Sequence, residues 1–200
     1  MKVIGITGNI GAGKTKIARI FEKFGCKVIE LDRLGHRILE SSTYKKKIIN
    51  TFGKFVLDKN NKINREKLRK IVFSNPSLLK KLNAIVHPGL KRELKNEINK
   101  MKRMRNVKAI VVDAALVFEI ELDNLFDVII TVYANKFLSF IRLMKSRNMN
   151  LFEFLNIYNS QMPVKEKKRR ADFVITNNLP WVLNKRRVEK KILKIIQYLE

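Results

Sequence analysis

The sequence predicts an α/β fold, with a five-stranded parallel sheet flanked by helices. Five short runs are apolar at nearly every position and rich in β-branched residues, which is typical of strands buried on both faces of a parallel sheet. Helical patterns separate these runs, and such alternation characterises α/β folds. The chain has 200 residues, 46% of them hydrophobic, which suits one domain with a substantial core.

The expected strands share this continuous apolar character and lie at residues 2–7, 27–31, 107–113, 127–134 and 172–177. The first expected helix covers residues 14–24, because Ile17 and Phe21 fall on one helical face and Gly25 can cap its end. A long basic helix is expected over residues 181–199.

Two helical stretches interrupt the strand pattern. The first covers residues 33–106, is polar, and has Leu90 and Leu94 at helical spacing, so we expect an insertion beside the sheet. The second covers residues 135–170, between the fourth and fifth strands. We therefore expect a single domain over residues 1–200. Its sheet would be formed by residues 1–32, 107–134 and 172–200.

The composition argues against a secreted or membrane protein. The chain has one cysteine, Cys26, so no intrachain disulfide can form, and its apolar neighbours indicate a small core residue. No signal peptide precedes the first strand, and no apolar run reaches the roughly 18 residues that a membrane span needs. We expect a cytoplasmic monomer with no membrane partner.

The net charge of +25 comes from 43 Lys and Arg against 18 Asp and Glu. Such a charge can indicate a polyanionic partner, nucleic acid above all. It can also reflect a lysine-rich proteome, which we favour because lysines are spread along the whole chain without an aromatic-rich binding strip. Nucleic acid is therefore not the expected partner. A phosphorylated small substrate would also be steered by this field.

The segment Gly8–Thr15, GNIGAGKT, matches the complete phosphate-loop pattern between an expected strand and an expected helix. Such a loop turns backbone N–H groups toward phosphate oxygens, and the following helix adds its positive dipole end. The glycines permit the backbone angles and the close approach that this requires. The expected nucleotide-binding residues are Gly8, Asn9, Gly11, Ala12, Gly13, Lys14, Thr15 and Lys16.

Three residues are candidates for the charge chemistry of a magnesium-bound nucleoside triphosphate. Lys14 would neutralise the β and γ oxygens, and the hydroxyl of Thr15 would ligate Mg²⁺. Asp113 ends an expected strand, where an acid faces the ligand crevice of a parallel sheet, so it is the expected second metal anchor. A helix cap or a surface turn is the alternative role for Asp113.

Phosphoryl transfer to an alcohol also needs a carboxylate beside the acceptor hydroxyl. Asp32 follows the second expected strand and should lie at the C-terminal edge of the sheet, and Glu30 points to the same side two residues earlier. Asp32 is the better candidate for the base because it lies nearest to the crevice. Capping of a helix that starts at Arg33 would explain Asp32 equally well.

Five segments in order resemble the dephospho-coenzyme A kinase family, and the resemblance runs over nearly the whole chain. They are KVIGITGNIGAGKT, VIELDRLGH, LNAIVHPGL, VVDAALVFE and the stretch from IRLMKSR through SQMPVKEKKRRADFVITN. The phosphate loop alone is shared by many kinases, whereas the ordered set is far more specific. The resemblance implies a P-loop NTPase-type fold in which residues 33–106 bind the acceptor and residues 135–170 form a lid.

The resemblance also implies a reaction: transfer of the γ-phosphoryl of ATP, with Mg²⁺, to the ribose 3′-hydroxyl of dephospho-coenzyme A. Asp32 matches the second acid of the family's Asp-x-Asp motif and would be the base, and Asn177 matches a position near the adenine. Without the resemblance, core packing explains Leu116 and Phe118, and a loop position before proline explains His87. The residues that match the family's acceptor pocket are His87, Pro88, Leu116, Phe118 and Glu119.

Arg142 matches the family's lid arginine and would stabilise charge on the transferring phosphoryl group while the lid excludes water. The surrounding segment places Phe137, Phe140 and Met144 on one helical stripe, and Arg142 lies off that stripe. A solvated basic helix is the alternative explanation for this segment.

Several positions depart from the family pattern. We expect an altered affinity for the acceptor but retained activity, because the phosphate loop, Asp32 and Arg142 are intact. The departures are Glu30 for a usual Asp, Lys16 for a Ser or Thr that touches the α-phosphate, Ala115 for Pro, Lys91 for Arg, and Ile157 or a neighbour for an arginine upstream of Gln161.

Two other functions remain open on the residues alone. A kinase for another small alcohol or nucleotide would share the phosphate loop and the carboxylate. An ATPase stimulated by nucleic acid would make use of the +25 charge and would show a steep salt dependence.

Overall fold

The computed structural model of this protein describes residues 1–199. The chain divides into two compact units. The first contains residues 1–30 and the chain from residue 97 onward, and the second contains residues 31–96. The second unit overlaps the insertion expected over residues 33–106.

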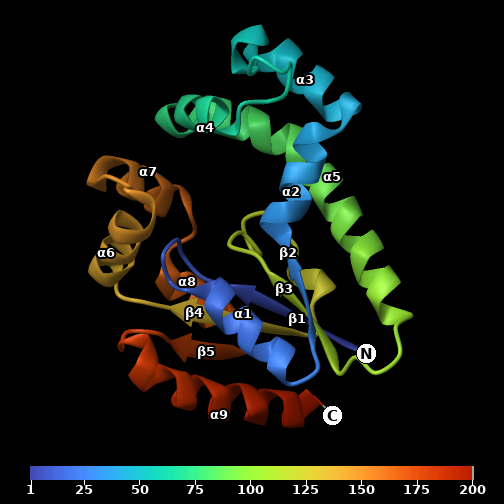
Figure 1. The fold of residues 1–200 in the computed structure, drawn as a ribbon, viewed down its shortest axis with the longest axis vertical. Coiled ribbons are helices and arrows are strands. Elements are labelled where there is room, and N and C mark those ends of the chain that lie inside the picture. Colours follow the sequence, from blue (N-terminus) through green and yellow to red (C-terminus); the bar gives the residue numbers. More distant parts are fainter. Residues whose placement is uncertain (200) are drawn as a thin grey trace. The chain divides into compact units, whose positions relative to one another are not determined.

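The first unit holds a five-stranded sheet in the order β2-β3-β1-β4-β5, and every pair of neighbours is parallel (Figure 1). The predicted five-stranded parallel sheet is therefore confirmed, although some strands are shorter than expected. Asp113 of β3 is in register with Ile6 of β1 and Glu30 of β2, so the C-terminal ends of these strands meet at one edge. The strands are β1 (Lys2–Thr7), β2 (Lys27–Glu30), β3 (Ala109–Asp113), β4 (Val128–Tyr133) and β5 (Phe173–Thr176).

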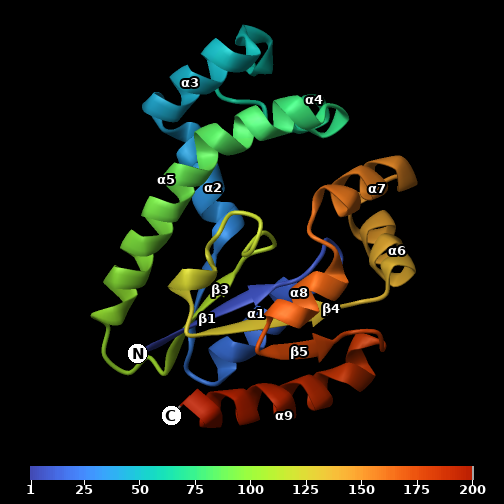
Figure 2. The same cartoon turned by 180° about the vertical axis from the view of Figure 1, so that it is seen from behind.

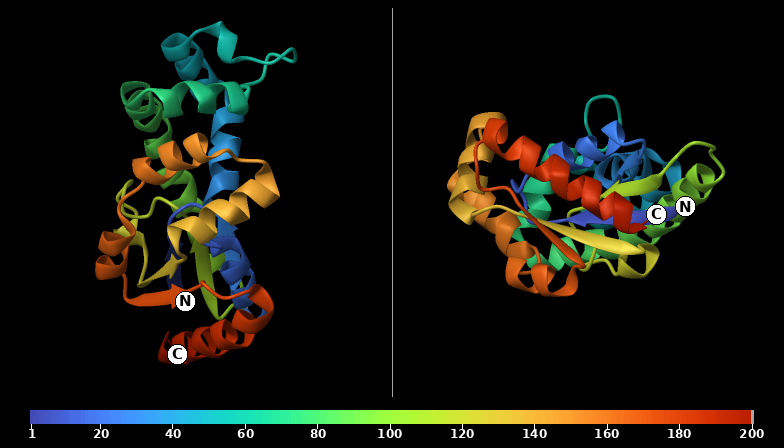
Figure 3. Two further views of the ribbon diagram at one scale, coloured as in Figure 1. Left: turned by 90° about the vertical axis from the view of Figure 1, so that its left-hand side faces the viewer. Right: turned by 90° about the horizontal axis from the view of Figure 1, so that it is seen from below.

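Helices cover both faces of the sheet, which explains why its strands are apolar without alternation. On one face, α1 (Lys14–Lys23) and α9 (Trp181–Leu199) share a core with β1, β3, β4 and β5, and the end of α9 lies beside the start of β1 (Figure 3). On the other face, α8 (Val164–Arg170) lies over β4 (Figure 2). Thr131 of β4 points to this second face, where its Oγ1 donates to the carbonyl of Lys167 over 3.0 Å.

The stretch expected to be helical over residues 135–170 forms α6 (Lys136–Arg147), α7 (Leu151–Ser160) and α8, as predicted. The apolar stripe on α6 is not the buried face of this helix, because Phe137 is 71% exposed and Met144 is 43% exposed. Ser139 and Leu143 are buried instead. A Cβ on Gly11 would lie 2.6 Å from the carbonyl oxygen of Ser139, so this face of α6 packs closely on the phosphate loop and requires a small side chain.

The second unit is helical, with a separate core formed by Ile48, Phe52, Val56, Leu68 and Val72. His87 and Pro88 lie inside a long helix, so the alternative of a loop histidine is wrong. Helix α2 begins at Leu31 directly after β2, which places Asp32 in the first helical turn and not at the N-cap. The elements are α2 (Leu31–Glu40), α3 (Ser42–Phe52), η1 (Lys54–Val56), α4 (Arg65–Ser74) and α5 (Pro76–Lys102), the last of which continues into the first unit.

A short 3₁₀ turn, η2 (Asp123–Leu125), precedes β4 and completes the elements of the first unit. Across residues 1–199, no helix has both the length and the apolar character needed to cross a bilayer.

The burial of α9 leads to a prediction about stability. Ile192→Ala removes a fully buried side chain from the α1–α9 core and should lower the free energy of unfolding by about 2–5 kcal/mol. The matched control, Leu193→Ala, changes a neighbour that is 42% exposed and should cost much less. Urea unfolding followed by circular dichroism measures both, and equal losses would contradict the assigned face of α9.

Candidate active site

The phosphate loop connects β1 to α1 and is shaped by glycines with positive φ. The φ angles are 143° at Gly8, 77° at Gly11 and 90° at Gly13, a region that L side chains rarely adopt. Space demands glycine as well, since a Cβ at Gly8 would collide with the carbonyl of Val132 and one at Gly13 with the side chain of Asn177. Helix α1 begins at Lys14, so its positive dipole end adjoins this loop.

The hydroxyl of Thr15 and the carboxylate of Asp113 meet beside the phosphate loop. Thr15 Oγ1 donates to Asp113 Oδ2 over 2.7 Å. Asp113 is 9% exposed at the end of β3, which excludes the alternative of a surface acid. A hydroxyl and a carboxylate are hard oxygen ligands of the kind that Mg²⁺ prefers, so this pair fits the predicted metal anchor.

Asn177 links the phosphate loop to β5, and its side chain is almost fully buried. Its Nδ2 donates to the carbonyl of Ala12 over 2.8 Å, and its Oδ1 accepts from Asn184 Nδ2 over 2.9 Å. Because the carbonyl of Ala12 can only accept, these partners determine which way the amide of Asn177 points. The structure therefore places Asn177 directly against the loop that the sequence predicts to hold phosphates.

Asn184 is not among the site residues expected from the sequence. A usable signal existed, because Asn184 is a polar residue on the same helical stripe as Val188 and Ile192, which are buried in α9. A buried amide on an apolar stripe needs a hydrogen-bonding partner. Here that partner is Asn177.

Arg142 of α6 lies at the same end of the sheet. Its Nη2 donates to the backbone carbonyl of Asn177 over 2.9 Å. Its Nη1 is buried and has no hydrogen-bond partner among residues 1–199, and burial lowers the pKa of its guanidinium. Arg142 is therefore no part of a solvated helix face, and its Nη1 is a buried donor whose hydrogen bond is not made within the described residues.

A second polar cluster lies around Glu119, in the turn after β3. Glu119 Oε1 is 2.7 Å from Lys167 Nζ and accepts from the backbone N–H of Met162 over 2.9 Å. Lys167 is fully buried, which the sequence does not predict, because this lysine lies within the charge run KEKKRR that resembles a solvated helix. Nothing in that run distinguishes the buried lysine from its neighbours.

The remaining candidates lie where the sequence places them but have less specific surroundings. Leu116 is half-buried, and Phe118 is 5% exposed with the guanidinium of Arg170 at 4.4 Å from its ring centroid. Lys16 Nζ lies 5.6 Å from the ring centroid of Trp181. The others belong to the second unit: Asp32 in α2, and His87 and Pro88 in α5. The roles of these residues stay predictions.

Comparison with known proteins identifies the family of this chain. The family model for dephospho-CoA kinase matches residues 2–181. The chain belongs to the dephospho-CoA kinase family. A dephospho-CoA kinase of Carboxydothermus hydrogenoformans is 37% identical over 180 residues, covering 89% of this chain and 86% of that protein. One from Fusobacterium nucleatum is 35% identical over 176 residues, covering 88% of this chain and 89% of that protein.

Solved structures lead to the same family and fold. A dephospho-CoA kinase from Campylobacter jejuni aligns with a TM-score of 0.71 at 28% identity, over 99% of this chain and 98% of that chain. A shikimate kinase from Bacteroides thetaiotaomicron aligns with a TM-score of 0.55 at 12% identity, over 98% of each chain, and shares the fold alone. The predicted dephospho-CoA kinase family and its P-loop kinase fold are thereby confirmed.

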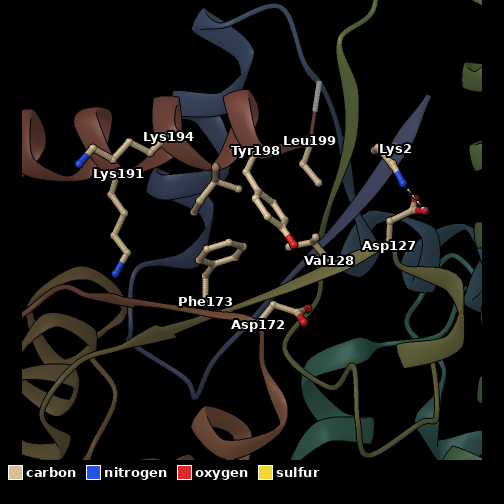
Figure 4. Close-up of a pocket in the computed structure, with 10 residues that line it drawn as sticks. Lys2, Asp127, Val128, Asp172, Phe173, Lys191, Lys194, Tyr198 and Leu199 are labelled. Carbon is tan, nitrogen blue, oxygen red and sulfur yellow. Dashed lines mark ion pairs between the residues drawn. The ribbon is translucent and has the colours of Figure 1, made fainter.

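A hollow of about 750 Å³ lies at the opposite edge of the sheet, below the end of α9 (Figure 4). Both carboxylates that line it already accept hydrogen bonds from the backbone. Asp127 Oδ2 accepts from the N–H of Val3 and Asp172 Oδ2 from the N–H of Ile129, each over 2.7 Å. Lys2 also pairs with Asp127 at 3.6 Å. These contacts hold the starts of the strands together, and no dephospho-CoA kinase chemistry is assigned to this hollow.

The surroundings of His87 lead to a prediction about pH. Burial, with a smaller contribution from the positive charge of Lys91, lowers the pKa of His87 below its usual value of 6.5. The unfolded chain therefore binds this proton more tightly, so the protein should lose stability as the pH falls below 6.5 toward the lowered value. His87→Asn should reduce this loss, measured as urea midpoints between pH 8 and pH 5.

The matched control for His87 is His36→Asn, which changes an exposed histidine on α2. This variant should follow the wild-type pH dependence of stability. If His87→Asn and wild type lost stability equally, the half-buried position of His87 would be contradicted.

Proposed function

We propose that this chain transfers the γ-phosphoryl group of ATP to the ribose 3′-hydroxyl of dephospho-coenzyme A, giving coenzyme A and ADP. The observation that carries the proposal is the contact between Thr15 and Asp113 beside a glycine loop of positive φ, in a chain of the dephospho-CoA kinase family. A hydroxyl–carboxylate pair beside a phosphate cradle is the arrangement that a metal-bound triphosphate needs.

ATP and Mg²⁺ are the proposed cofactors. The backbone of the phosphate loop would surround the β- and γ-phosphates, and Lys14 would compensate their charge. Thr15 and Asp113 would hold the metal ion, whose chemistry is to neutralise charge on the β and γ oxygens. Asn177, through its contact with Ala12, supports the loop at the side where the adenine is expected.

Asp32 is the proposed general base. It lies two residues beyond Glu30, whose backbone pairs in register with Asp113, and two residues span at most about 7 Å of chain. Asp32 thus follows the end of β2 closely along the chain. Asp32 is exposed in the first turn of α2, so its carboxylate is accessible to an acceptor.

The proposed step is an in-line displacement. The 3′-oxygen of the acceptor forms a bond to the γ-phosphorus, and the bond from this phosphorus to the β–γ bridging oxygen breaks. Asp32 takes the hydroxyl proton, and the electron pair leaves with ADP. Lys14 and the unpaired Nη1 of Arg142 are the cationic groups proposed to stabilise charge on the transferring group.

The acceptor pocket is proposed from the residues that match the family. Leu116 is half-buried and would supply apolar surface in the first unit, where Phe118 is buried beside it, and His87 and Pro88 lie within α5. Glu119 has only one oxygen left for an acceptor, because its Oε1 is already bound by Lys167 and Met162.

An acceptor panel tests the proposed reaction. The purified chain, with ATP and Mg²⁺, should release ADP with dephospho-coenzyme A and not with shikimate, nucleoside monophosphates or nucleosides. Phosphorylation of one of these other acceptors, and not of dephospho-coenzyme A, would establish a different small-molecule kinase. ADP release that requires only RNA or DNA would establish a nucleic-acid-stimulated ATPase.

A variant of Asp32 tests the proposed base. Asp32→Asn should keep ATP binding and lower kcat for transfer by about 10²- to 10⁴-fold, because the acceptor hydroxyl loses its proton acceptor. The matched control is Glu40→Gln, which removes an exposed acid from the same helix and should leave kcat unchanged. Near-normal turnover of the Asp32 variant would reject the role of base.

A further inference from the structure

Lys167 of α8 is a buried cation that the proposed reaction does not use. Its side chain is fully buried, and Nζ donates to Glu119 Oε1 over 2.7 Å and to the carbonyl of Ala115 over 2.6 Å. Burying an ammonium group costs free energy unless acceptors and an opposite charge compensate it. Such a residue is retained in a folded chain only where its surroundings supply both.

The acceptors of Lys167 are shared with other segments. Glu119 Oε1 also accepts from the N–H of Met162, which lies between α7 and α8. The carbonyl of Ala115 also accepts from the hydroxyl of Thr7, the last residue of β1, over 3.1 Å. Lys167 therefore joins three parts of the first unit: the end of β1, the turn after β3, and the junction that leads into α8.

The same α7–α8 junction, residues 161–163, also binds residues 9–10, which we call the outer turn of the phosphate loop. The N–H of Ile10 donates to Gln161 Oε1 over 2.9 Å, and Asn9 Nδ2 donates to the carbonyl of Met162 over 3.4 Å. Asn9 is 4% exposed, so these contacts lie within the protein. A chain of hydrogen bonds thus runs from Lys167 through Glu119 and Met162 to the loop.

The charges of this region are coupled as well. Burial lowers the pKa of Lys167, the carboxylate of Glu119 opposes this effect, and the positive charge of Lys14 adds to the lowering. Glu119 compensates the charge of Lys167 through the ion pair at 2.7 Å.

We propose that Lys167 is a positioning residue for the phosphate loop. It clamps the α7–α8 junction onto the turn after β3, and the junction in turn holds Asn9 and Ile10 in the conformation that receives a triphosphate. The proposal rests on the proposed function for the identity of ATP as the nucleotide. Without the clamp, the outer turn of the loop is free to move away from the phosphates, so affinity for MgATP falls.

The test removes the ammonium group of Lys167 and measures its effects on protein stability and on nucleotide affinity separately. Lys167→Met leaves the carboxylate of Glu119 buried without its cation, so the unfolding temperature should fall. Adding Glu119→Gln removes that uncompensated charge and keeps an amide oxygen for the N–H of Met162. The double variant should therefore regain most of the lost unfolding temperature.

The deciding measurement is the affinity for the Mg²⁺ complex of a non-hydrolysable imido analogue of ATP, by calorimetry and without acceptor. We expect the single and the double variants to bind it about 10- to 100-fold more weakly than wild type. Lys167→Arg, which keeps the charge and the donors, should recover part of the affinity. The matched control is Lys165→Met, an exposed lysine of the same helix, which should bind as wild type does.

Two results would overturn the proposal. One is wild-type affinity in the double variant, which would show that Lys167 serves stability alone. The other is wild-type affinity in Lys167→Met. A wild-type protein that binds the analogue but does not phosphorylate dephospho-coenzyme A would overturn the proposed function and leave this inference standing.

Discussion

The close approach of three neighbouring elements to the phosphate loop is the constraint on which the rest of the structure depends. Gly8, Gly11 and Gly13 pass against the backbone of Val132, helix α6 at Ser139 and the side chain of Asn177. Because glycine alone provides both the positive φ and the space, the loop can pack closely against these elements at the C-terminal ends of the strands. That position brings Thr15 to Asp113, and it creates the oxygen pair from which the proposed function follows.

Polar contacts, more than apolar packing, connect this loop to its surroundings. The carbonyl of Ala12 is held by Asn177, and the N–H of Ile10 is held by Gln161. Arg142 on α6 and Lys167 on α8 bring two cations to the same end of the sheet, and both are partly or fully desolvated. Hydrogen bonds in a water-poor region have strict geometry, so they can set the loop's position more sharply than apolar contacts can. The helices that follow β4 are in this way coupled to the nucleotide site.

The sequence predicted the parts of the fold whose physical signals are local. The five buried strands follow from continuous apolar runs, and the phosphate loop follows from its spacing of glycines and Lys14. The failures are positions where tertiary contacts decide. Helix α5 continues through Pro88, and α6 buries Ser139, which lies against Gly11, while the more apolar Phe137 and Met144 stay exposed. Lys167 looks like any member of a charge run until its acceptors, which lie far from it in sequence, are known.

The geometry of the reacting groups can be measured directly by crystallising the chain with MgADP, aluminium fluoride and dephospho-coenzyme A. Aluminium fluoride occupies the place of the transferring phosphoryl group, so such a structure shows donor, acceptor and base together. We predict the fluoride complex inside the phosphate loop, the metal ion on Thr15, and a carboxylate oxygen of Asp32 within about 3.2 Å of the 3′-hydroxyl. An acceptor hydroxyl in line with the fluoride complex, but with Asp32 turned away and another group in contact with it, would contradict the proposed mechanism.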